Sequence, residues 1–109
     1  MSFNIIITPP FVRELKRLAK KYPSVKQDFR ELLEELSFNP HIGKSIGNSC
    51  YKIRLAISFK GKGKSGGARV ITYVQIIDEE IFLISIYDKS ENDSISDKDI
   101  ISKIAGLGK

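Results

Sequence analysis

The chain has 109 residues, of which 41% are hydrophobic and 28% charged. This composition excludes a disordered chain and predicts one domain over residues 1–109, with no stretch apolar enough to cross a bilayer. The formal net charge of +5 favours a polyanionic partner such as nucleic acid. Cys50 is the single cysteine and no signal-peptide pattern opens the chain, so we expect a cytoplasmic protein without disulfides.

The first predicted elements are a strand and two helices. Residues 3–7 form a short β-branched run that ends at Pro9-Pro10, which predicts a strand. Apolar residues then recur at helical spacing up to Tyr22, and Pro23 ends that helix. Ser24 and Gln27 fit a capping box for a second helix, which ends at Asn39-Pro40. Two amphipathic helices joined by a tight break predict a helical hairpin.

Three strand-like runs and a short helix follow. Residues 50–57 alternate, with Lys52 and Arg54 facing away from the apolar side chains. Residues 68–77 and 81–87 are mostly apolar and β-branched, with a turn at residues 78–80 between them. Ser96 and Asp99 fit the start of a final helix. The predicted fold is therefore α+β: a mostly antiparallel four-stranded sheet with the hairpin packed on it and a short C-terminal helix.

Positive charge is concentrated in the middle of the chain. Between Leu36 and Ile77 there is no acidic residue. Such a cluster has a strong positive potential, as expected for binding a phosphate backbone. A solvated lysine loop is the alternative, but Lys52 and Arg54 share one face of a strand, which favours binding. The cations of this stretch are Lys44, Lys52, Arg54, Lys60, Lys62, Lys64 and Arg69.

Aromatic and basic residues on the strands are candidates for catalysis. Arg69 begins a strand, and a rigid element suits fixed contacts to a transition state better than a loop does. Tyr73 shares its predicted face, and Tyr87 and Lys89 alternate after the last apolar run. Aromatic rings beside cations can stack on RNA bases. For Tyr87 and Lys89 the alternative is an ordinary polar strand end. Residues 60–67 alternate lysine and glycine, and the alternative for this glycine-lysine loop is a flexible connection without a phosphate contact.

Other catalytic arrangements find little support. His41 is the single histidine and lies in a predicted loop, while Cys50 has no metal-ligand set near it in the sequence. A thiol dyad of these two residues stays open. No acidic cluster resembles a metal-dependent nuclease, so we expect neither metal nor cofactor. An RNA-cleaving site of this kind would use the 2′-OH of RNA as nucleophile, cations to stabilise the phosphate, and lysine or tyrosine for proton transfer.

The order of these segments resembles the RelE/ParE toxin superfamily, and the glycine-lysine loop looks most like HigB-type members. The similar segments are Cys50-Tyr51-Lys52-Ile53-Arg54-Leu55, Arg69-Val70-Ile71-Thr72-Tyr73, residues 81–87 and Lys89. The resemblance implies an mRNA endoribonuclease that depends on the ribosome and is neutralised by a cognate antitoxin. It also implies binding to operator DNA only as a toxin–antitoxin complex.

The same resemblance implies roles for individual residues. Lys52 and Arg54 would assist proton transfer and contact the phosphate, Arg69 would stabilise the scissile phosphate, and Lys89 would assist the leaving group. RelE has a C-terminal tyrosine that stacks on the substrate base, but Ile95 is near the matching position here. Tyr87 or Tyr73 is the expected substitute. RNA and ribosome contacts are expected from Lys44, Lys60, Lys62, Lys64 and Tyr73.

Two other functions compete with this one. A ParE-like inhibitor would poison DNA gyrase without cutting RNA, and a plain basic RNA-binding domain would not be toxic. The basic sheet residues favour RNA cleavage over both. We also expect a helix or strand of the antitoxin to cover the basic face or to wrap the helical hairpin.

Overall fold

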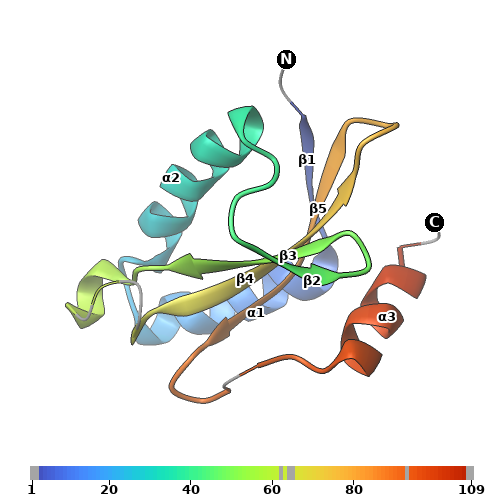
Figure 1. Ribbon diagram of the computed structural model, residues 1–109. Coiled ribbons are helices and arrows are strands. Elements are labelled where there is room, and N and C mark those ends of the chain that lie inside the picture. The colour runs from blue at the N-terminus through green and yellow to red at the C-terminus, as the bar shows by residue number, and fades with distance from the viewer. Residues whose placement is uncertain (1–2, 62, 64–65, 93, 108–109) are drawn as a thin grey trace.

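The computed structural model describes residues 3–61, 63, 66–92 and 94–107. Within these residues a five-stranded sheet is combined with three α-helices and one short 3-10 helix, η1 (Figure 1). None of the described helices is long and apolar enough to cross a bilayer. In chain order the elements are β1 (Asn4–Ile7), α1 (Pro9–Lys21), α2 (Val25–Phe38), β2 (Lys44–Gly47), β3 (Cys50–Leu55), η1 (Ser58–Lys60), β4 (Ala68–Gln75), β5 (Glu80–Asp88) and α3 (Asp97–Ala105).

The sheet has one more strand than the sequence predicts, and it is mixed. Its order is β1-β5-β4-β3-β2, and β1 lies parallel to β5 while the other pairs are antiparallel. The missed strand, β2, is only four residues long and lacks apolar alternation. It pairs with β3 through a tight turn in which Asn48 and Ser49 have φ of 55° and 62°. Two residues with positive φ are typical of a hairpin turn that matches the sheet twist.

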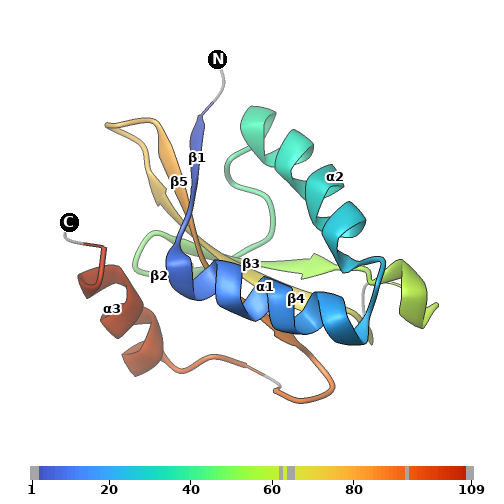
Figure 2. The same cartoon turned by 180° about the vertical axis from the view of Figure 1, so that it is seen from behind.

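Helices cover both faces of the sheet. The predicted hairpin of α1 and α2 is confirmed, and it packs on one face over Ile53, Val70 and Leu83. On the other face, α3 packs through Ile100 over a second apolar cluster that includes Ile71. Figure 1 shows α3 on the opposite side of the sheet from α1, which lies in front of the sheet in Figure 2. On this face, α3 covers one part of the sheet, and another part carries the candidate residues of β3, β4 and β5.

The helix starts follow the predictions unequally. The Ser96 hydroxyl accepts the backbone N–H of Asp99 at 3.1 Å, which confirms the predicted cap of α3. The predicted capping box at Ser24 is wrong, because the Ser24 hydroxyl donates to Asp28 Oδ2 at 3.0 Å and accepts the N–H of Phe59 at 2.8 Å. Asp28 also accepts the N–H and hydroxyl of Ser58. These residues tie the start of α2 to η1 instead of capping the helix.

Candidate functional site

Three candidate residues form a row across the sheet. Arg54 of β3 lies opposite Arg69 of β4, which lies opposite Tyr87 of β5. Cross-strand partners point to the same face, with Cβ atoms about 5 Å apart. The next rung brings in Lys52, whose partner on the edge strand is Lys44. Pairing of the strands thus gathers four of the predicted cations and one tyrosine on the face opposite the helical hairpin.

The residues of the row and of the adjoining rung differ in exposure. Arg54 and Lys44 are exposed and Lys52 is half-buried, whereas Arg69 is only 3% exposed. The Arg69 side chain donates from Nη1 to the carbonyl oxygen of Ala68 at 3.0 Å. Burial lowers the pKa of Arg69, and repulsion by Arg54 lowers it further, while Tyr87 opposes both effects. Arg69 lies at the start of β4, as the sequence predicts, and neighbouring residues enclose it.

Tyr87 is the aromatic member of this row. It is 5% exposed, and its hydroxyl is buried without a hydrogen-bond partner among the described residues. Burial raises the pKa of Tyr87, and the positive charge of Arg69 counteracts part of this rise. A phenol whose pKa is raised stays protonated at neutral pH. Tyr87 can therefore donate a hydrogen bond or a proton on this face, but it is not a ready base.

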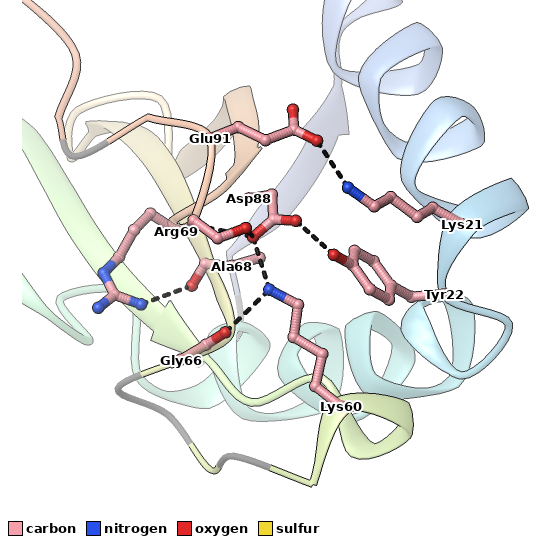
Figure 3. Close-up of polar contacts among 9 residues, drawn as sticks. Lys21, Tyr22, Lys60, Gly66, Ala68, Arg69, Asp88 and Glu91 are labelled. Carbon is pink, nitrogen blue, oxygen red and sulfur yellow. Dashed lines mark hydrogen bonds and ion pairs between the residues drawn. The ribbon is translucent and has the colours of Figure 1, made fainter.

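Lys60 takes part in a buried network on the other face of the sheet (Figure 3). Its ammonium lies 2.6 Å from Asp88 Oδ1 and 3.0 Å from the carbonyl oxygen of Gly66, and 4.8 Å from the centre of the Tyr22 ring. The Tyr22 hydroxyl donates to Asp88 Oδ2 at 2.7 Å. The ammonium is thus engaged inside the protein, which gives Lys60 a structural role, and its RNA contact stays a prediction.

Asp88 is the centre of this network and was not predicted from the sequence. Burial by itself would raise the pKa of Asp88, but hydrogen bonds from Lys60, Tyr22 and Ser90 outweigh it and hold the pKa well below its usual range. Asp88 follows Tyr87 in β5 and pairs with Ala68, which precedes Arg69. The network therefore fixes the strand ends that carry Arg69 and Tyr87. In the sequence, Asp88 reads as an ordinary strand end and Tyr22 as part of an apolar stripe.

The remaining predicted residues lie away from the row. Lys89 follows the end of β5, donates its backbone N–H to Gly67 at 3.1 Å, and borders a hollow that Tyr22 and Lys60 also line. Tyr73 shares the face of Arg69 as predicted, but it pairs with Cys50 at the far end of β3 and packs against Phe82. The predicted contacts Lys62 and Lys64 lie outside the described residues.

Cys50 and His41 lie on opposite sides of β3. Cys50 is fully buried in the cluster under α3. The His41 ring packs on Tyr51, which lies on the same face of β3 as Ile53, and Ile53 packs against the hairpin. This arrangement removes the thiol dyad that the sequence left open. Among the described residues, no group of three or more histidine, cysteine, aspartate or glutamate side chains is placed to hold a metal ion.

The Cys50 thiol is expected to resist alkylation in the folded protein. Burial raises its pKa to about 11, and only the thiolate reacts quickly. With iodoacetamide at pH 8, mass spectrometry should detect little modification of the native chain and full modification after denaturation. Rapid alkylation of the native chain would contradict the packing of Cys50 in this cluster.

Comparisons with known proteins match this fold to one family. Residues 11–106 match the family described as the RelE toxin of the RelE/RelB toxin–antitoxin system. The isolated E. coli RelE toxin is 21% identical, with a TM-score of 0.62 over 94% of this chain and 99% of that one. A free E. coli RelE variant with two arginines changed to alanine is 22% identical, with a TM-score of 0.62 over 85% and 90%.

A third similar structure comes from a complex with the antitoxin. The intact E. coli RelBE toxin–antitoxin complex matches with 22% identity and a TM-score of 0.60, over 80% of this chain and 96% of that one. At this identity the structures show a shared fold. The family match covers nearly the whole domain, including every strand of the row formed by Arg54, Arg69 and Tyr87. The chain therefore belongs to the RelE toxin family.

Proposed function

We propose that this chain is the toxin of a toxin–antitoxin pair and cleaves mRNA on the ribosome without a metal ion. The observation that carries the proposal is the row of Arg54, Arg69 and Tyr87, with Lys52 and Lys44 on the adjoining rung. Two guanidinium groups side by side present the charge and hydrogen-bond donors that a phosphate accepts. The hydroxyl of Tyr87 adds a proton donor beside them.

The proposed chemistry uses the RNA's own nucleophile. The 2′-OH attacks the adjacent phosphorus and gives up its proton to water, the bond to the 5′ oxygen breaks to leave a 2′,3′-cyclic phosphate, and the 5′ oxygen takes up a proton. Arg54 and Lys52, the accessible cations, contact the phosphate first, and Arg69 adds charge from behind them. Tyr87 or Lys52 supplies the proton, and we assign Lys89 an outer role in leaving-group departure because it lies beyond the strand.

In this proposal, cleavage depends on the ribosome because Arg69 and Tyr87 are buried. Both residues are almost fully buried, so a free RNA strand meets mainly Arg54, Lys52 and Lys44. A host that holds the mRNA in a fixed geometry supplies the orientation that a shallow basic face lacks. Direct contact of the phosphate with Arg69 requires neighbouring residues to move when RNA binds.

A cognate antitoxin is the proposed regulatory partner, acting with the toxin in the cytoplasm. E. coli RelE occurs in a complex with its antitoxin RelB and with a RelB peptide. For this chain we propose an antitoxin segment that covers the basic row, because acidic or polar side chains there would compete with RNA. Binding to operator DNA is assigned to the complex and not to the free toxin.

The test is cell-free translation with the purified protein, followed by primer extension on the mRNA. We expect cuts within codons that appear only when ribosomes are present and persist in EDTA-treated toxin. Intact mRNA with normal protein synthesis would refute the proposal. Gyrase supercoiling assayed on the same preparation then separates a gyrase inhibitor from a harmless RNA-binding domain.

A further inference from the structure

A polar hollow lies beside Tyr87, between α1, β5 and α3. It is separate from the basic row except that both include Tyr87. Its walls come from segments far apart in the sequence, so folding alone brings them together. The lining side chains used below are Glu14, Ser85, Tyr87, Ile95, Asp99 and Lys103.

Two of these groups have unused hydrogen-bonding capacity. Glu14 is half-buried, and its Oε1 atom accepts the Ser85 hydroxyl and the N–H of Ile86, both at 3.4 Å. Such contacts are long for hydrogen bonds, and a carboxylate has about four acceptor positions. The Tyr87 hydroxyl, buried in a residue that is 5% exposed, has no partner among the described residues. Tyr87 lines the hollow, and a buried hydroxyl without a partner in such a residue indicates a group that can gain its partner when a ligand binds and the side chain adjusts.

We propose that this hollow binds one base of the substrate RNA by its edge, and that Glu14 selects a base with an exocyclic amino group. The inference rests on the proposed function, because RNA must reach Tyr87 for the base to enter. An ionised carboxylate only accepts hydrogen bonds. Adenine, cytosine and guanine each offer an amino group to it, whereas the pairing edge of uracil presents two carbonyl oxygens around a single N–H.

The rest of the lining fits a base better than a phosphate. Glu14 and Asp99 place two carboxylates at the hollow, which disfavours a dianion, and Lys103 is the cation that partly offsets them. Ile95 contributes an apolar wall against which a base can pack. Residue 95 cannot stack as an aromatic ring does, so recognition here relies on hydrogen bonds at the base edge.

Sharing of Tyr87 couples base binding to the reaction. Its ring belongs to the row with Arg69, and it also lines the hollow. A base held by Glu14 would place its own sugar and phosphate next to that row. Glu14 is thus a specificity-determining residue, and we expect cleavage to favour codons that put an amino-bearing base at this position.

To test this, the ¹⁵N-labelled full chain is titrated with AMP, CMP, GMP or UMP. The chemical shifts of the backbone amides of Ser85, Ile86 and Ile95 are followed by NMR. We expect at least one amino-bearing nucleotide to bind about tenfold more tightly than UMP. Glu14→Gln, which keeps the acceptor for Ile86, should abolish that preference. The matched control is Glu34→Gln, an exposed residue of α2, which should retain it.

The outcomes separate this inference from the function. Absence of shifts at these amides, equal binding of UMP, or a preference that survives Glu14→Gln would each overturn the base site, whether or not mRNA is cut. Base selection by Glu14 in a protein that cuts no mRNA on ribosomes would support the site and refute the proposed nuclease. With an active enzyme, the cut-site preference in primer extension should also broaden in Glu14→Gln and not in Glu34→Gln.

Discussion

Replacing Arg54 by alanine is expected to lower ribosome-dependent mRNA cleavage by about 100-fold or more. Arg54 is the exposed guanidinium of the row and lies directly opposite Arg69, so its loss removes the first phosphate contact. It also removes a repulsion that lowers the pKa of Arg69. Because the side chain is exposed, the free energy of unfolding should change by less than about 1 kcal/mol. The measurement is the rate of primer-extension product formation in a cell-free extract.

Controls separate local charge at the row from overall charge. Arg30→Ala removes an exposed arginine of α2 and should leave cleavage unchanged, while Arg54→Lys should retain part of the activity. Wild-type cleavage by a folded Arg54→Ala variant would refute the proposed site. Arg69→Ala should also abolish cleavage, but Arg69 is buried, so this variant is informative only if its unfolding curve shows a folded protein.

Replacing Asp88 by asparagine is expected to destabilise the fold by about 3–5 kcal/mol. The Lys60 and Asp88 side chains are 9% and 0% exposed and lie 2.6 Å apart, so the change leaves the Lys60 ammonium without its counter-charge. Two further donors, Tyr22 and Ser90, lose a charged acceptor. Urea unfolding at pH 7 measures the effect. The double variant Lys60→Met/Asp88→Asn should recover part of the loss, and a single variant as stable as wild type would contradict this role.

The same carboxylate predicts a dependence of stability on pH. The pKa of Asp88 in the folded chain lies below its unfolded value of about 3.9, so its stabilisation is complete above that pH and is lost as pH falls toward the folded pKa. The free energy of unfolding of wild type should therefore drop more steeply below about pH 4 than that of Asp88→Asn. Equal slopes for the two proteins would show that Asp88 is not held by this network.

Elements with strong local signals could be predicted from the sequence. The amphipathic stripes of α1 and α2, the apolar runs of β3, β4 and β5, and the cap at Ser96 depend on side-chain period and local hydrogen bonds. The strand β2 was not predicted because it is short and polar and forms only by pairing with β3. The predicted capping box does not form because the Ser24 hydroxyl makes hydrogen bonds with Asp28 and with the backbone N–H of Phe59 in η1 instead.

For the site, the sequence by itself determined the residue types and the strands that carry them. A segment without acids and the alternation of Lys52 and Arg54 already indicated a basic face. The tertiary structure decided which cations belong to that face, because register across antiparallel strands, not distance along the chain, placed Arg54 beside Arg69 and Tyr87. It also decided that Lys60 is buried with Asp88, since burial depends on packing between residues far apart in sequence.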